Sequence, residues 1–191
     1  SDPIADVRGA GRHQPDYMHR EAHDTLPELL QALGVQRPVL LGHSDGGTIA
    51  LLHAARHPVS ACIVMAPHVI VEDVSIRAIE AAREAYVGGK LRERLSRFHH
   101  DVDNAFWQWN DIWLSPAFRD YDIRPECEAI TCPLLAIQGE DDPYGSLQQI
   151  EDIRPSGPIT RMALAGCGHS PHREAPQPTL QAIVAFLADQ P

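Results

Sequence analysis

The stretch "VLLGHSDGGTIALLHAARHP", residues 39–58, decides the fold that we expect for this chain. The apolar run in "RPVLLG", at 37–42, predicts a short strand that is buried throughout. A turn of small residues follows, and residues 48–56 favour a helix that His57 and Pro58 end. The order is therefore a buried strand, a tight turn and a helix, with one serine at the apex of the turn.

Within this turn, Gly42, Ser44 and Gly46 satisfy the pattern G-x-S-x-G. Between a strand and a helix, this pattern is typical of a nucleophile elbow. Small residues two positions before and two after the serine let the backbone segments approach, and the hydroxyl then projects near the helix N-terminus. Asp45 is a second candidate nucleophile, but the bulky His43 fits that register poorly. Ser44 is therefore the preferred nucleophile.

The remaining sequence predicts an α/β fold. Apolar residues at helical spacing precede the quoted stretch and end at Gly34: Met18, Ala22, Leu26, Leu29, Leu30 and Leu33. Further buried strands are expected at 61–67, 132–139 and 159–166, the last one weaker. Near-continuous apolar strands that alternate with helices indicate a mostly parallel sheet with helices on both faces.

One long interval, 68–130, breaks this alternation and is helical in pattern. We expect residues 1–67 and 131–191 to form the core and 68–130 to form a helical lid inserted in it. The lid contains Trp107, Trp109 and Trp113, which could line a substrate pocket. Aromatic residues in a small helical layer more often form its own core, and both interpretations stay open here.

A serine hydroxyl needs a base to take its proton and a third group to orient that base. His169, in the glycine-flanked loop "GCGHSPHREAP", is the candidate base. The segment "IQGEDDPYG" offers two candidate acids, Asp141 and Asp142, after the third strand. His172 is expected at the surface or the rim of the pocket, and His43 beside the elbow.

Three segments, "LLGHSDGG", "LLAIQGEDDP" and "GCGHSPHREAP", resemble the signatures of the α/β-hydrolase superfamily, in the superfamily's order. The resemblance covers about residues 17–190. It implies Ser44 as nucleophile and His169 as base. It selects Asp142, three residues after Gly139, as the acid. The family's G-H-x4-E-x-P pattern is matched by Gly168, His169, Glu174 and Pro176.

The resemblance also implies the activity: hydrolysis of an ester, thioester or similar acyl bond of a small molecule, with no cofactor. Cleavage of carbon–carbon bonds and a cofactor-free haloperoxidase activity use the same triad in some relatives, and remain open. The backbone N–H of Asp45 is the expected oxyanion-hole donor. Its carboxylate either attracts cationic substrates or caps the helix through the N–H of Thr48, and we prefer the cap.

One part of the family pattern is not visible here. Relatives carry further strands before this region, and a loop that donates the second oxyanion-hole N–H. We therefore expect a shortened sheet whose 37–42 strand has an exposed edge, which a homo-oligomer could cover. A non-catalytic alternative follows: a truncated domain of this type that binds a ligand or a partner without turnover.

Composition excludes several other classes. The formal net charge of -10, with no basic stripe to offset it, disfavours nucleic acid and anionic lipid as partners. No apolar run approaches the roughly 20 residues that span a bilayer, and the start of the chain is unlike a signal peptide. The four cysteines lack zinc-site spacing, which suits a reducing cytoplasm. Residues His99, His100, Asp101 and Asp103 could suggest a metal, but adjacent side chains point in different directions, so we predict no metal site.

Overall fold

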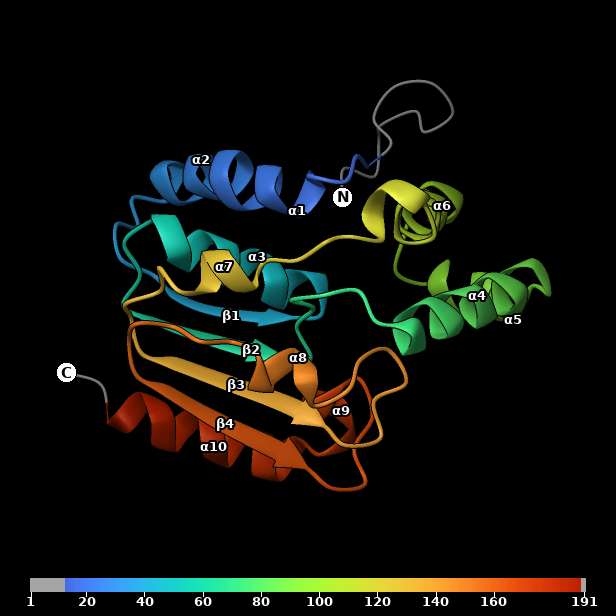
Figure 1. The fold of residues 1–191 in the computed structure, drawn as a ribbon. Helices are drawn as coiled ribbons and strands as arrows, with labels where there is room; N and C mark the ends of the chain where they lie inside the picture. Colours follow the sequence, from blue (N-terminus) through green and yellow to red (C-terminus); the bar gives the residue numbers. More distant parts are fainter. Residues whose placement is uncertain (1–12, 190–191) are drawn as a thin grey trace. The chain divides into compact units, whose positions relative to one another are not determined.

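The computed structural model describes residues 13–189, and within them the strands form one sheet of four parallel strands (Figure 1). The strands stand in the order β1-β2-β3-β4: β1 is Val39–His43, β2 is Ala61–Met65, β3 is Leu134–Gly139 and β4 is Ile159–Leu164. Helices separate the strands along the chain, as parallel pairing requires. The predicted α/β class with a parallel sheet is therefore confirmed.

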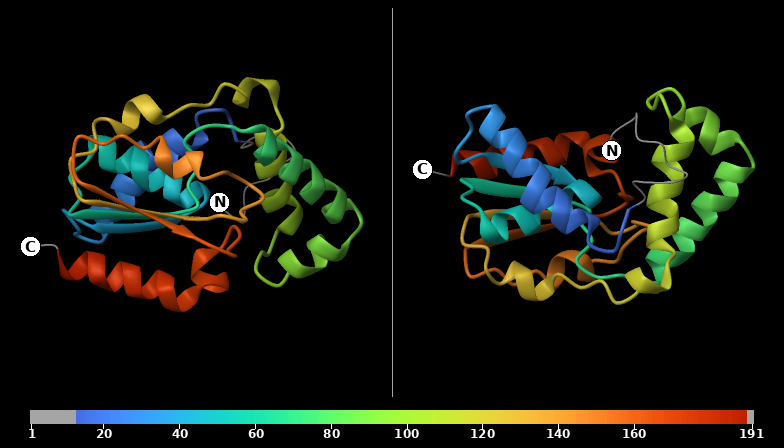
Figure 2. Two further views of the ribbon diagram at one scale, coloured as in Figure 1. Left: turned by 60° about the horizontal axis from the view of Figure 1, so that its bottom comes forward. Right: turned by 90° about the horizontal axis from the view of Figure 1, so that it is seen from above.

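Helices cover both faces of this sheet. Helix α3 packs against β1 and β2 on one face, and α10 packs on the opposite face, as Figure 2 shows. Within 13–189, no helix is long and apolar enough to cross a bilayer. The helices outside the inserted segment are α1 (Tyr17–Arg20), the π-helix η1 (Glu21–Thr25), α2 (Leu26–Ala32), α3 (Asp45–Arg56), α7 (Arg124–Cys127), α8 (Gln148–Glu151), α9 (Pro171–Glu174) and α10 (Pro176–Ala188).

The first expected amphipathic helix is built differently from its sequence pattern. Met18 and Ala22 are buried, but Leu29 and Leu33 are 53% and 65% exposed. The cause is the π-helical turn η1, whose i→i+5 hydrogen bonds add a residue to the turn and rotate the following residues off the buried face. The helix ends as predicted, with Gly34 at a φ of 69°.

Strand β1 was expected to be buried on both faces, and the structure corrects this. Leu40 is buried, whereas Val39 and Leu41 are 50% and 54% exposed. Leu41 pairs with Ile63, so both side chains point to the face of the sheet on which α10 lies. Helix α10 packs over the cluster that contains Ile63 and Leu135, and leaves the outer part of that face exposed at the edge strand.

The inserted segment forms a compact unit of its own, from Val71 to Tyr121, together with the described residues up to Tyr17. The other unit comprises Met18–Ile70 and the residues from Asp122 onward. The inserted unit contains α4 (Asp73–Val87), α5 (Lys90–Leu95), α6 (Val102–Trp113) and the 3-10 helix η2 (Pro116–Phe118). Its core is built on Tyr86, Val102 and Phe106, with the rings of Tyr86 and Phe106 stacked at 3.7 Å. That the segment acts as a lid stays a prediction.

Candidate active site

Ser44 occupies the turn between β1 and α3 in a conformation that L-residues seldom adopt, with φ 55° and ψ −126°. Such backbone strain costs about 1–3 kcal/mol and persists only where the surroundings enforce it. Here the N–H of Ser44 donates to the carbonyl of Met65 at 2.9 Å. Its own carbonyl accepts from Gly47 N at 2.8 Å and from Thr48 N at 3.1 Å. The serine is thus held by the neighbouring strand and by the first turn of α3.

The two glycines of the G-x-S-x-G pattern play unequal parts. A Cβ at Gly42 would lie 2.2 Å from the carbonyl oxygen of Gly46, which is far inside contact distance. At Gly46, by contrast, the position of a Cβ has no described atom within 4 Å apart from its chain neighbours and the backbone of its own helix. The expectation that packing requires a small residue on both sides of Ser44 is therefore wrong at Gly46. Close approach of backbone requires glycine only at position 42.

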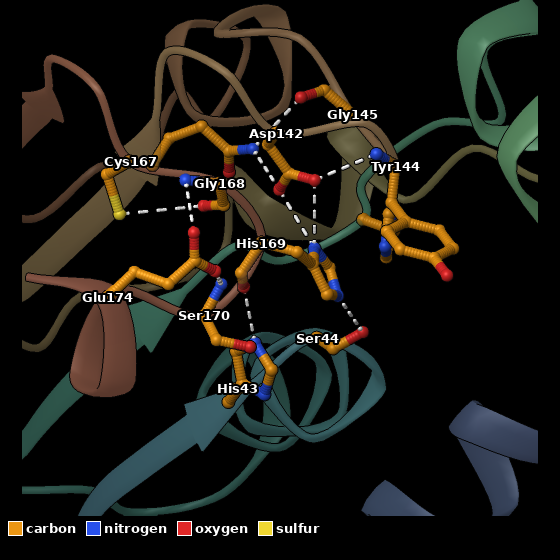
Figure 3. Close-up of polar contacts among 12 residues, drawn as sticks. His43, Ser44, Asp142, Tyr144, Gly145, Cys167, Gly168, His169, Ser170 and Glu174 are labelled. Atoms are coloured by element: carbon orange, nitrogen blue, oxygen red, sulfur yellow. Dashed lines mark hydrogen bonds and ion pairs between the residues drawn. The ribbon is translucent and has the colours of Figure 1, made fainter. Parts of the chain in front are cut away.

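His169 lies in the loop between β4 and α9 and contacts both other residues of the predicted triad (Figure 3). Its Nε2 is 3.0 Å from the Oγ of Ser44. Its Nδ1 lies 2.9 Å and 3.0 Å from the two carboxylate oxygens of Asp142. With the Asp142 carboxylate ionised, Nδ1–H donates to it, which leaves Nε2 as the acceptor of the Ser44 hydroxyl proton.

Asp142 follows β3 and is 7% exposed. Its Oδ1 accepts from the backbone N–H of Tyr144 at 2.8 Å, and its Oδ2 accepts from Nε2 of Gln138 at 2.8 Å. Asp141 is exposed, and its backbone N–H donates to the carbonyl of Cys167. Of the two carboxylates that the sequence leaves open, Asp142 is the one that the structure brings to His169.

The backbone around His169 is fixed from two sides. The carboxylate of Glu174 accepts from Gly168 N at 2.9 Å and from Ser170 N at 2.8 Å. On the other side, Nε2–H of His43 donates to the carbonyl of His169 at 2.7 Å. These bonds, drawn in Figure 3, hold the loop so that the imidazole can face Ser44. His43 therefore lies beside the elbow, as the sequence predicts.

His68 was not predicted, although it lies close to the triad. It follows β2, is 4% exposed, and its ring centroid is 5.8 Å from that of His169. The Thr48 hydroxyl accepts from His68 N at 2.9 Å and donates to His68 O at 3.0 Å. Burial lowers the pKa of His68 to about 3, so its ring is neutral near pH 7. Burial also lowers the pKa of His43, and the bond to the His169 carbonyl opposes this shift.

Asp45 is the first residue of α3, so its N–H lies at the N-terminus of the helix, directly after the nucleophile. Its role as an oxyanion donor stays a prediction. The N–H of Thr48 donates to the carbonyl of Ser44 at 3.1 Å, and the preferred cap by the Asp45 carboxylate stays a prediction. The helix starts three residues earlier than expected, which makes Ser44 the N-cap residue.

The three tryptophans all lie on α6 in the inserted unit. Trp113 is 1% exposed, and its indole N–H donates to the hydroxyl of Tyr17 at 3.1 Å. Trp107 and Trp109 are half-buried and pack against the cluster around Phe106. Trp113 thus contributes to the core of its own unit. A contact of any of the three with substrate stays a prediction.

The acidic and histidine residues at 99–103 serve local structure where the contacts are known. The Asp101 carboxylate accepts from Asn104 N and so caps α6. The Asp103 carboxylate accepts from the Tyr86 hydroxyl and from the guanidinium of Arg92. Across 13–189, no group of three or more His, Cys, Asp and Glu is arranged to hold a metal ion.

Comparison with known proteins finds relatives that are named as hydrolases. The profile of the "Alpha/beta hydrolase family" matches residues 4–182. The chain is 27% identical over 154 residues to "Serine hydrolase BPHL" of Homo sapiens, which covers 72% of this chain and 52% of that protein. It is 28% identical over 185 residues to "Esterase YbfF" of Escherichia coli (strain K12), covering 86% of this chain and 72% of that protein. The chain thus spans about half the length of the human relative.

Among solved structures, the enol-lactonase from Burkholderia xenovorans LB400 superposes with a TM-score of 0.69. The match covers 96% of this chain and 79% of that chain, at 21% sequence identity. At this identity the likeness supports the fold.

Proposed function

Because the chain belongs to the alpha/beta hydrolase family, we propose that it is a serine hydrolase that cleaves an ester, thioester or similar acyl bond of a small molecule. The observation that carries the proposal is the continuous path of hydrogen bonds from Ser44 Oγ through His169 to Asp142. Relatives named as an esterase and as a serine hydrolase support the same reaction class.

The geometry suits a two-step acyl transfer. The Ser44 Oγ attacks the acyl carbon while its proton passes to Nε2 of His169, and the Asp142 carboxylate stabilises the imidazolium that forms. The proton then passes to the leaving group as the acyl–oxygen or acyl–sulfur bond breaks. Water, deprotonated by His169, next attacks the acyl-enzyme and releases the acid and Ser44. The backbone N–H of Asp45 would donate to the oxyanion in both steps.

The strained elbow supports this role for Ser44. Its backbone conformation costs free energy, and a purely structural serine in a turn has no need of it. The inserted unit, with Trp107 and Trp109, would select the substrate. Hydrolysis of an ester and of a thioester needs the same catalytic groups, as do carbon–carbon bond hydrolysis and haloperoxidase chemistry. The substrate class must therefore be identified by measuring turnover of different substrates.

The test is covalent labelling with a fluorophosphonate probe, which phosphonylates an activated serine. Wild type should be labelled, Ser44→Ala should not, and Ser60→Ala should behave as wild type, since Ser60 is an exposed serine that donates to the Arg37 carbonyl. Turnover of p-nitrophenyl esters and acyl thioesters should fall at least about 10⁴-fold in Ser44→Ala. Folded wild-type protein that is neither labelled nor active would refute the proposal and favour the binding-module alternative.

A further inference from the structure

Gln138 is a buried polar residue in an otherwise apolar strand. Strand β3 is buried at all six positions, and Gln138 is 1% exposed among leucine, isoleucine and alanine. Burial of an amide without hydrogen bonds costs about 1–3 kcal/mol in proteins. A Leu or Met at this position would carry no such cost, so the interactions of the amide must explain its presence.

The amide of Gln138 donates to two acceptors at once. Its Nε2 lies 2.8 Å from the Oδ2 of Asp142 and 3.0 Å from the carbonyl oxygen of Gly145. The two N–H bonds of the amide are therefore both used, and a flipped amide would place its own oxygen against two oxygens. The orientation of the side chain is fixed by these two acceptors.

These contacts also fix the carboxylate of Asp142. Each oxygen of the Asp142 carboxylate accepts one further hydrogen bond. The N–H of Tyr144, in the loop after β3, donates to Oδ1, and the Nε2–H of Gln138, in β3, donates to Oδ2. Rotation of the carboxylate would break both bonds, so both oxygens stay directed at Nδ1 of His169, as Figure 3 shows for Asp142, Tyr144 and His169. The bond to Gly145 fastens the following loop to the strand as well.

We propose that Gln138 is a positioning residue, which holds the Asp142 carboxylate in the orientation that aligns His169 with Ser44. Gln138 acts through Asp142 and does not itself touch the substrate. The inference rests on the proposed function for its effect on rate, but the alignment that it describes exists whether or not the protein turns over a given ester.

The test replaces the amide by an apolar chain of similar shape, in Gln138→Met. A matched control is Gln149→Met, because Gln149 is equally buried and its amide bonds to the backbone of Val69 and Ile70. Misplacement of a catalytic group costs up to about 100-fold in rate. We expect Gln138→Met to lower kcat for an activated ester, and the rate constant of fluorophosphonate labelling, by about 10- to 100-fold. KM should not change, and Gln149→Met should keep wild-type rates per folded molecule.

A double-mutant cycle distinguishes positioning from general damage to the fold. If Gln138 acts through Asp142, Gln138→Met should have no further effect in an Asp142→Ala background. An equal fold-loss in both backgrounds would overturn the inference, and so would a wild-type labelling rate in the single variant.

A readout that does not need turnover separates this inference from the proposed function. In wild type, the Nδ1–H proton of His169 should give a resolved low-field NMR signal, because the Asp142 carboxylate holds it. Gln138→Met should broaden or shift that signal, and Gln149→Met should not. If the probe fails to label wild type, the proposed function falls. An unchanged Nδ1–H signal in Gln138→Met overturns the positioning role by itself.

Discussion

The imidazole of His43 donates from Nε2–H to the carbonyl oxygen of His169 at 2.7 Å. His43, which precedes Ser44, thus fixes the backbone of His169, whose ring contacts Ser44. The two rings also lie 5.0 Å apart, centroid to centroid. This contact holds together the end of β1 and the loop after β4, although two strands, β2 and β3, lie between β1 and β4 in the sheet.

Replacement of His43 by leucine should therefore loosen the loop of His169. A buried hydrogen bond contributes about 1 kcal/mol, and its loss leaves the carbonyl unsatisfied. We expect His43→Leu to lower the free energy of unfolding by about 1–3 kcal/mol, measured by urea titration, and to slow fluorophosphonate labelling by roughly tenfold. His43→Gln, whose amide can donate in place of the ring, should recover part of both. Equal effects of the two substitutions would contradict this role.

The unequal glycines of the elbow give a second prediction. In Gly42→Ala the new Cβ meets the backbone of Gly46 at 2.2 Å, so the turn or the start of α3 must shift. We expect a loss of about 3 kcal/mol or more in stability, and low yield of folded protein. Gly46→Ala meets open space and should change stability by less than about 1 kcal/mol. Thermal unfolding of the two variants side by side measures the difference, and equal losses would refute the assignment.

Glu174 gives a third prediction through its two bonds to the backbone. In Glu174→Ala, the amides of Gly168 and Ser170 lose their acceptor. Hydrogen exchange resolved to single amides should therefore show lower protection at both positions. Glu174→Gln keeps one acceptor oxygen and should retain protection at one of them. Labelling of Ser44 should slow in the alanine variant, because His169 lies between the two released amides. Unchanged exchange at both amides would show that the loop is held by other contacts.

Four histidines whose pKa values are lowered by burial predict how stability changes with pH. The pKa of His68 is about 3 in the folded chain and near 6.5 when unfolded, so between these values the unfolded chain binds the additional proton. The stabilising contribution of the neutral ring is complete above pH 6.5 and is lost as the pH falls, by about 1.4 kcal/mol per unit. The pKa values of His43, His53 and His23 are also lowered, mainly by burial, and act in the same direction.

Urea unfolding at pH 7, 6 and 5 measures this effect. The free energy of unfolding should fall over this range in wild type, and His68→Gln should reduce the slope by up to one proton. His99→Gln provides the control, because the side chain of His99 is exposed. A slope that is the same in wild type and in His68→Gln would show that His68 does not titrate in this range.

The sequence predicted the features that follow from local pattern. The parallel strands, the turn at Ser44 and the placement of an acid and of His169 at the same edge follow from apolar runs and from the rule that parallel strands share one carboxyl edge. The choice of Asp142 over Asp141 came from the resemblance to the α/β-hydrolase superfamily. Gly139 shows why this arrangement needs its flanking glycines, since a Cβ there would lie 2.2 Å from the carbonyl of Cys167. Predicting the strands and the turn at Ser44 requires no knowledge of contacts distant in the chain, whereas the close approach at Gly139 is such a contact.

What the sequence missed depends on tertiary packing. The exposure of Leu29 and Leu33 depends on a π-helical turn, and the exposure of Val39 and Leu41 on how far α10 extends across the sheet. The role of Gln138 could have been predicted from the sequence. A single polar residue in an otherwise apolar strand, four residues before the acid, indicates that its amide has a hydrogen-bond partner. His68, polar at the end of another buried strand, gives the same signal.

The placement of the triad has a consequence for folding. Ser44, Asp142 and His169 follow β1, β3 and β4, and β2 and β3 lie between the first and the last of these strands. No pair of neighbouring strands is joined by a hairpin, so every pairing is non-local and slow to form. The hydrogen bond from Ser44 to His169 can therefore form only after the whole sheet has assembled. Reactivity of Ser44 would report the population of complete native sheets, which circular dichroism of the helices alone does not measure.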